Sequence, residues 1–195
     1  LNILDKYSAG NNGSGREWYG DHLGAGEEVT FNIAGWRSEK KVQVYARVLG
    51  RSLNAAEVQF TLNGTPLGKL ALEPILSGTY TQKGKLSQAT FSTDANLMNG
   101  AASTSIMISL TGSGAKANLD QLILEGARTL SLSDQPSLRF RNLESVAYAS
   151  TRFLLASAQS PVVWEITDPK NPRQMPVTSA NGKLRSLWLA SIIRI

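Results

Sequence analysis

Alternation of apolar and polar residues at every second position is the feature that most constrains this chain. In residues 42–48 aliphatic side chains occupy the even positions, and Gln, Tyr and Arg occupy the odd ones. The same period of two recurs in residues 29–33, 58–62 and 106–110. Successive side chains of a β-strand point to opposite faces, so each segment predicts a strand with one face toward a core. No stretch sustains a helical stripe for three turns, and we therefore expect an all-β fold.

Tight turns separate these segments. The dipeptides Asn63-Gly64, Asn99-Gly100 and Asn181-Gly182 are favoured in hairpins because both central positions need positive φ. Many short strands joined by such turns are typical of a sandwich or barrel. We expect a jelly-roll-like antiparallel β-sandwich over residues 10–132, with a glycine-rich loop at 10–15.

A break at 131–136 precedes a second, smaller β-unit over residues 133–195. Its expected strands are shorter and more apolar, and lie at 138–140, 145–149, 153–156, 162–166 and 184–189. These strands form either a small second domain or part of a sheet that other residues complete, and we favour the latter because a unit of this length buries little core by itself. Leu1 begins no signal peptide, and the last residues resemble an interrupted strand. We therefore expect a piece of a larger exported protein.

Composition excludes several chemistries. The chain has no cysteine and a single histidine, His22. Disulfides, thiolate metal sites and a cysteine nucleophile are excluded on this chain, and a His-centred zinc site or Ser-His-Asp triad is hard to build. The net charge is +5, but lysines and arginines are scattered, which argues against nucleic-acid binding. Apolar runs are too short to span a bilayer. We expect no catalytic residue, no cofactor and no metal, and we expect His22 in a surface loop.

Aromatic residues provide the candidate ligand sites. A possible sugar-stacking platform comprises Trp18, Tyr19, Trp36, Trp164 and Trp188, although large aromatics also fill sandwich cores. Trp164 and Trp188 adjoin aliphatic residues, which favours the core. The few carboxylates leave a glycosidase as a minor alternative, because the sequence alone does not place any two of them across a cleft. The residues retained as ligand or structural candidates are Trp18, Tyr19, Asp120, Trp164 and Asp168.

Two of these candidates are carboxylates with structural interpretations. Asp168 begins the segment Asp-Pro-Lys-Asn-Pro, which predicts an Asx-turn whose side chain accepts backbone N–H bonds. Asp120 precedes the apolar residues 122–124. We expect Asp120 to cap the loop or to accept N–H bonds from the turn at Gly114-Ala115.

Four local patterns occur in a distinctive order. They are Glu-Trp-Tyr-Gly-Asp-His-Leu at 17–23, Asn-Leu-Asp-Gln-Leu-Ile-Leu at 118–124, Leu-Arg-Phe-Arg at 138–141, and Val-Trp-Glu-Ile-Thr-Asp-Pro-Lys-Asn-Pro at 163–172. Together they resemble the region before the catalytic domain in the type IX secretion system sortases, the PorU-type C-terminal signal peptidases related to gingipain-type cysteine peptidases. The likeness spans about residues 15 to 180.

This resemblance implies a parent enzyme on the extracellular face of an outer membrane that removes C-terminal secretion signals from cargo proteins. Its chemistry would belong to a Cys–His pair, in which the imidazole activates the thiol and backbone donors hold the oxyanion. No nucleophile carries over, because the chain has no cysteine. The implied partners are the catalytic domain of the same polypeptide, cargo C-terminal domains and other secretion components.

Three hypotheses follow from the sequence. The first is a non-catalytic accessory domain of such a cysteine endopeptidase. The second is a carbohydrate-binding β-sandwich module of a secreted enzyme, with Trp18, Tyr19 or Trp36 stacking on a sugar. The third is a structural or adhesive surface domain.

Overall fold

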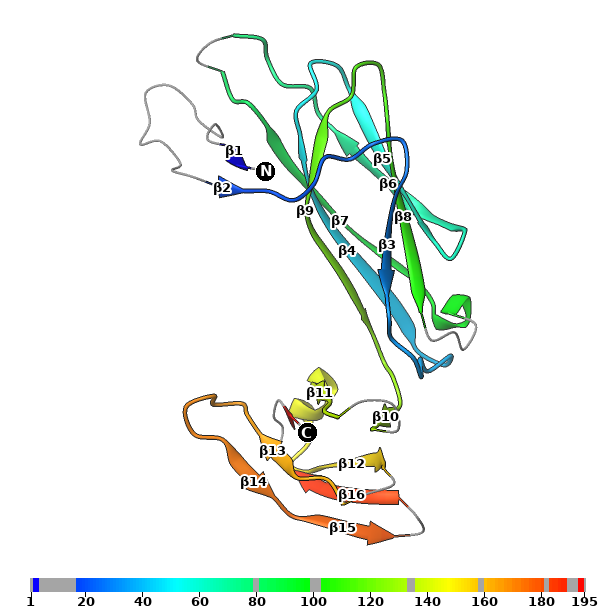
Figure 1. Ribbon diagram of the computed structural model, residues 1–195, viewed down its shortest axis with the longest axis vertical. Coiled ribbons are helices and arrows are strands. Elements are labelled where there is room, and N and C mark those ends of the chain that lie inside the picture. The colour runs from blue at the N-terminus through cyan, green and yellow to red at the C-terminus, as the bar shows by residue number, and fades with distance from the viewer. Residues whose placement is uncertain are drawn as a thin grey trace. The chain divides into compact units, whose positions relative to one another are not determined.

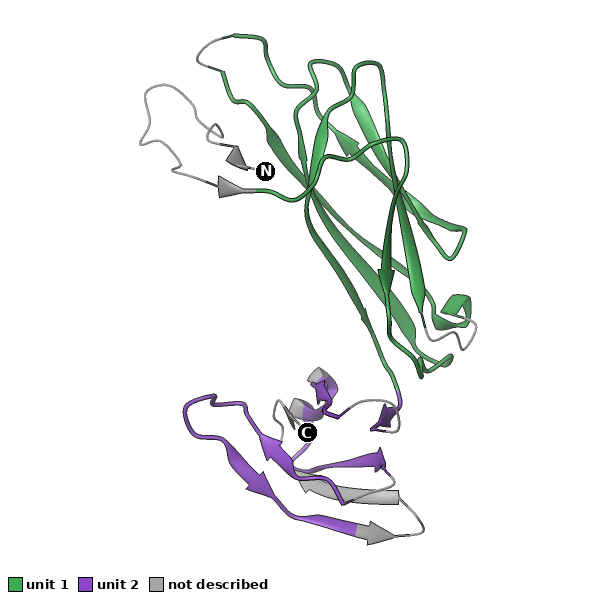
Figure 2. Cartoon of the chain, viewed as in Figure 1, with its two compact units in different colours: residues 1–128 green, residues 129–195 purple. Residues whose placement is uncertain are grey.

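The computed structural model describes residues 2–3, 17–78, 81–98, 103–132, 136–157, 160–180, 183–188 and 193–194. The chain divides into two compact units, residues 1–128 and 129–195 (Figure 2). The sequence places the boundary between residues 132 and 133. Whether each part folds independently stays a prediction.

Unit 1 is a sandwich of two antiparallel sheets (Figure 1). One sheet has the strand order β3-β8-β5-β6 and the other has the order β7-β4-β9. A short two-stranded pair, β1-β2, precedes them. The elements are β1 (Asn2–Ile3), β2 (Glu17–Trp18), β3 (Glu27–Phe31), β4 (Lys41–Gly50), β5 (Ala56–Leu62), β6 (Thr65–Leu72), β7 (Lys85–Asp94), the 3₁₀-helix η1 (Ala95–Met98), β8 (Thr104–Thr111) and β9 (Ala117–Gly126).

The core of unit 1 lies between the two sheets. The aliphatic positions of the alternating segments on β4, β5 and β8 are almost fully buried, and they are Val42, Val44, Ala46, Val48, Val58, Phe60, Leu62, Ile106 and Ile108. Removal of these side chains from water is the main stabilising contribution of such a sandwich. The prediction of an all-β sandwich from the period of two is confirmed.

The hairpin between β5 and β6 has the predicted turn. Asn63 and Gly64 have φ values of 46° and 82°, both in the left-handed region. The Asn63 amide group also donates to the Leu97 carbonyl (2.8 Å), and its oxygen accepts from the Ser105 N–H (2.9 Å). This turn therefore joins β5-β6 to the end of η1 and the start of β8. The other two Asn-Gly pairs, and the glycine-rich loop at 10–15, lie outside the described residues.

Edge strands β6 and β7 of the two sheets meet on one side of the sandwich. Gly68 on β6 faces the ring of Phe91 on β7, and a Cβ at this position would lie 2.6 Å from a ring carbon. Phe91 in turn packs on Phe60, with ring centroids 5.1 Å apart. The close approach requires glycine at position 68, since any side chain would displace the aromatic pair.

Unit 2 has two small four-stranded sheets with the strand orders β10-β12-β16-β15 and β11-β17-β13-β14. Pairing is antiparallel except between β10 and β12. Its core is a cluster around buried Val163, joined by Phe140, Phe153, Met175 and Val177. The elements are β10 (Leu130–Ser131), β11 (Arg139–Phe140), the 3₁₀-helix η2 (Leu143–Ala147), β12 (Thr151–Ala156), β13 (Val163–Glu165), β14 (Arg173–Met175), β15 (Val177–Ala180), β16 (Lys183–Trp188) and β17 (Ile193–Arg194).

The strand expected at 145–149 is wrong. Residues 143–147 form η2 instead, and Asn142 caps its start by accepting the Glu144 N–H on its side-chain oxygen (2.9 Å). The Ser145 hydroxyl donates to the Asn142 carbonyl (2.6 Å). These local side-chain bonds favour a capped turn over an extended strand.

Candidate functional site

Two sequence patterns that are far apart in the chain meet in unit 1. The segment after β2 runs beside the start of β9, where the Leu23 N–H donates to the Ala117 carbonyl (3.0 Å) and the Leu119 N–H donates to the Asp21 carbonyl (3.1 Å). His22, an exposed loop residue, pairs with Asn118 in an antiparallel bridge. The patterns at 17–23 and 118–124 therefore form one structural feature, which we call the β9 junction.

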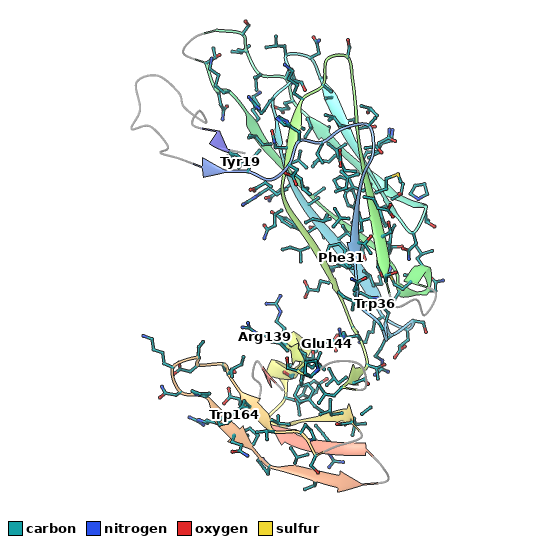
Figure 3. All side chains as sticks on the ribbon, in the orientation of Figure 1. Tyr19, Phe31, Trp36, Arg139, Glu144 and Trp164 are labelled. Atoms are coloured by element: carbon teal, nitrogen blue, oxygen red, sulfur yellow. The ribbon has the colours of Figure 1, made fainter. Side chains whose placement is uncertain are left out.

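Tyr19 and Gly20 hold the chain close to β9 at this junction. Tyr19, which directly follows β2 (Figure 3), is 5% exposed and packs with Leu49 at the end of β4. A Cβ at Gly20 would overlap the carbonyl oxygen of Leu119. The buried Asn118 side chain donates from Nδ2 to the Gly20 carbonyl (3.1 Å). The aromatic ring of Tyr19 is therefore used in packing and offers no stacking surface for a sugar.

Asp120 on the edge strand β9 forms an ion pair with Arg47 on the central strand β4. Arg47 Nε donates to Asp120 Oδ2, with 10% of the Asp120 side chain and 41% of the Arg47 side chain exposed. Arg47 pairs in register with Gln121 and Val48 with Leu119, so Asp120 is the extra residue of a β-bulge. The hydrogen bond to Asp120, followed by its negative charge, raises the pKa of Arg47, which stays protonated.

The expected role of Asp120 at the Gly114-Ala115 turn is wrong. Asp120 lies inside β9 rather than before it, and its carboxylate contacts Arg47. The Ala115 N–H instead donates to the Gly112 carbonyl (3.3 Å). Bulging redirects a side chain, and nothing in the local sequence signals it.

Trp36 packs against the core of unit 1. A Cβ at Gly126 would lie 2.7 Å from the Trp36 ring, so the indole covers the end of β9. Trp36 also forms a backbone bridge to Arg128. With Tyr19 buried, two of the five aromatic residues of the possible sugar platform serve packing. The side chains of Trp18 and Trp188 lie outside the described residues.

Trp164 is not a core residue of unit 2, contrary to the sequence interpretation. It lies on β13 opposite Gln174 and is 39% exposed, whereas Val163 faces the core (Figure 3). Because neighbouring residues of a strand face opposite ways, burial of Val163 directs Trp164 outward. Glu165 lies on the same face as Val163 and is half-buried rather than pointing to solvent.

Asp168 forms the predicted Asx-turn. Its Oδ1 accepts the Lys170 N–H (2.9 Å), and its Oδ2 accepts from Asn171 Nδ2 (2.7 Å). The Asn171 N–H also donates to the Asp168 carbonyl (3.0 Å). The hydrogen bond from the Asn171 side chain, and then that from the Lys170 backbone, lowers the pKa of Asp168. The turn is exposed and structural, and it joins β13 to β14.

Arg47 and the exposed leucines Leu53 and Leu76 are not identified by the sequence analysis. Arg47 occupies a polar position in the alternation of β4, but its partner Asp120 lies 73 positions away. Leu53 and Leu76 lie in loops, where a single leucine has no periodic pattern. Within the part of the chain that the structure describes, no group of three His, Cys, Asp or Glu residues is placed to hold a metal ion. No helix among these residues is long and apolar enough to cross a membrane.

These features define an all-β protein. The sequence patterns at 17–23 and 118–124 stabilise its fold through packing, hydrogen bonds and an ion pair. A crystal structure of dimeric latent PorU from Porphyromonas gingivalis has the same fold, with a TM-score of 0.72. The two chains are 18% identical, and the match covers 90% of this chain and 18% of PorU. The chain therefore spans less than a fifth of the PorU chain, and the likeness at this identity concerns the fold.

Two carbohydrate-binding modules are also similar, but with low scores. The module CBM36 in complex with calcium and xylotriose has a TM-score of 0.36 and 13% identity, covering 60% of this chain and 86% of the module. The CBM36-1 domain of a multidomain xylanase from the hindgut metagenome of Trinervitermes trinervoides has a TM-score of 0.36 and 17% identity. This match covers 62% of this chain and 84% of that domain. Scores at this level support no functional argument. No family model and no curated protein matches the chain.

Proposed function

We propose that this chain is a non-catalytic accessory region of a type IX secretion sortase, a cysteine endopeptidase that removes C-terminal secretion signals from cargo proteins. The observation that carries the proposal is the shared fold with PorU over 90% of this chain. The order of the four sequence patterns supports it independently of the fold. The region would act at the cell surface, next to the catalytic domain of its own polypeptide.

The positions of the motif residues suit a supporting role. Gly20, Asn118 and Asp120 fix the β9 junction and the pairing of β9 with β4. Asp168 fixes the turn between β13 and β14. Residues of this kind give an accessory region a defined shape, and the chemistry is left to a Cys–His pair elsewhere in the polypeptide.

Purified full-length gene product tests this proposal. It should cleave the C-terminal domain from a cargo protein, and replacement of a cysteine outside residues 1–195 should abolish cleavage while leaving this region folded. Mass spectrometry of the cargo termini measures the result. A full-length sequence with a glycosidase domain or adhesin repeats, and with no Cys–His domain, would contradict the proposal.

The sugar-binding alternative lacks a comparable observation. Tyr19 and Trp36 pack within unit 1, and the carbohydrate-binding modules match with TM-scores of 0.36. Among the aromatic candidates whose side chains the structure describes, Trp164 in unit 2 is exposed. Glycan-array binding that disappears in Trp164→Ala would favour this alternative over the sortase proposal.

A further inference from the structure

Three loops are joined at the end of the sandwich where β4 ends. The Ile75 N–H donates to the Ser52 carbonyl (2.9 Å), and the Arg51 N–H donates to the Lys116 carbonyl (2.8 Å). The buried Ser52 hydroxyl accepts the Lys116 N–H (2.8 Å). Ser52 therefore fixes the loops relative to each other. We call this end of unit 1 the loop platform, and it comprises residues 51–55, 73–78, 81–84 and 112–116 (Figure 1).

Two leucines of the loop platform point to solvent. Leu53 is 61% exposed and Leu76 is 77% exposed, and both line a shallow, open hollow. The Thr81 hydroxyl hydrogen-bonds the carbonyl oxygens of Leu76 and Gly78, at 2.9 Å each. Hydrogen bonds from the Thr81 side chain to backbone carbonyls therefore stabilise this loop, whereas the exposed Leu76 side chain does not contribute to the core. Exposed apolar groups gathered at one place are characteristic of interaction surfaces.

The loop platform has more basic than acidic residues, and one of the basic residues, Lys83, lines the same hollow as the leucines. The loop platform contains three basic residues, Arg51, Lys83 and Lys116, and one acidic residue, Glu73. Glu73 is paired with Lys85 at the start of β7 (3.1 Å). Lys83 lines the hollow, where its ammonium group donates one hydrogen bond to the Gly78 carbonyl (2.6 Å) and retains two further N–H donors.

We propose that the loop platform binds the surface of an anionic lipid bilayer. Leu53 and Leu76 enter the boundary between headgroups and acyl chains, and a lipid phosphate lies in the hollow beside Lys83. Stable attachment to a membrane surface combines apolar insertion with attraction of basic residues to anionic lipids, and the loop platform has both. Because Leu53 and Leu76 project from loops, both side chains can enter the apolar layer of the bilayer without a change in the sheets. This proposal does not depend on the sortase assignment.

Sedimentation of the 195-residue chain with vesicles tests the proposal. Vesicles of phosphatidylcholine alone should bind little, and vesicles with about a third phosphatidylglycerol should bind the chain. The double variant Leu53→Ser/Leu76→Ser should lower the partition coefficient about tenfold or more, because two apolar side chains no longer insert. Lys83→Gln should lower it about fivefold, in keeping with one basic residue near an anionic surface. Circular dichroism checks that the variants remain folded.

Matched controls use the same substitutions at other exposed sites. Leu154→Ser changes a leucine of unit 2 that is 51% exposed, and Lys41→Gln changes an exposed lysine at the opposite end of β4. Both should bind vesicles like the unchanged chain. Absence of binding to anionic vesicles, equal losses in the controls, or binding that ignores the leucine substitutions would overturn the proposal. Binding to an acidic leucine-containing peptide without binding to vesicles would also overturn it, in favour of a protein partner.

Discussion

The side chain of Asn118 donates a hydrogen bond from Nδ2 to the carbonyl oxygen of Gly20 (3.1 Å), across 98 positions of sequence. The donor belongs to the pattern at 118–124 and the acceptor to the pattern at 17–23. Asn118 is fully buried, and a side chain at Gly20 would overlap the Leu119 carbonyl. The two patterns are therefore coupled by packing and hydrogen bonding.

Replacement of Asn118 by Ala should destabilise the chain by about 0.5–1.5 kcal/mol, because the part-buried hydrogen bond to the Gly20 carbonyl is lost. Urea unfolding followed by circular dichroism measures the change. Asn54→Ala is the control, since the Asn54 amide makes a long, exposed bond to the Ser113 carbonyl (3.4 Å). A loss of stability at Asn118 no larger than that at Asn54 would show that the junction adds little to folding.

Arg47 and Asp120 should be modestly coupled in their contributions to the free energy of unfolding. A double-mutant cycle with Arg47→Gln and Asp120→Asn should give a small favourable coupling free energy, because Arg47 is 41% exposed and solvent screens the pair. Denaturant unfolding of the four proteins supplies the cycle. Additive effects of the two substitutions would mean that the pair has no net role at the bulge.

The carboxyl group of Asp168 should titrate below its ordinary range, because hydrogen bonds from Asn171 and Lys170 favour its charged form. The pKa of Asp168 is lower in the folded state than in the unfolded state. These hydrogen bonds therefore stabilise the folded chain above the unfolded-state pKa, and this stabilisation is lost as the pH falls through the folded-state pKa. An NMR titration of the Asp168 side chain measures this. Asn171→Ala should raise the midpoint toward the value of an unstructured aspartate, about 3.9. A midpoint unaffected by Asn171→Ala would contradict the assigned cause.

Neighbouring residues of β13 should respond differently to truncation. Val163→Ala should cost about 1–2 kcal/mol, because Val163 is buried among Phe140, Phe153 and Met175. Trp164→Ala should cost less, despite removing a larger side chain, because Trp164 is 39% exposed. Thermal unfolding of both variants makes the comparison. A larger loss for Trp164 would place the Trp164 ring, rather than the Val163 side chain, in the core of unit 2.

Sequence patterns predict those strands in which hydropathy and burial alternate together, as on β4, β5 and β8. Strand β7 also alternates in burial, but its half-buried positions include Ser87 and Thr93 as well as Ala89 and Phe91. Period-two hydropathy is therefore weak there, and the strand is not recognisable. The turn at Asn63-Gly64 and the Asx-turn at Asp168 are predictable because they depend on neighbouring residues.

Features that depend on register are not predictable from local patterns. The bulge at Asp120 requires knowledge of how β9 pairs with β4, and the outward direction of Trp164 requires knowledge of which face of β13 is covered. Likewise, the loop platform depends on Ser52 joining loops distant in sequence. Each of these follows from tertiary packing rather than from the local order of residues.

Processing of cargo proteins in cells measures the proposed accessory role most directly. In the bacterium that carries the gene, an in-frame deletion of residues 17–188 should leave C-terminal secretion signals on cargo proteins. Replacement of the catalytic cysteine of the full-length protein should give the same defect, and mass spectrometry of cargo termini detects both. Normal removal of the signals in the deletion strain would contradict the proposal that this β-sandwich region supports a C-terminal signal peptidase.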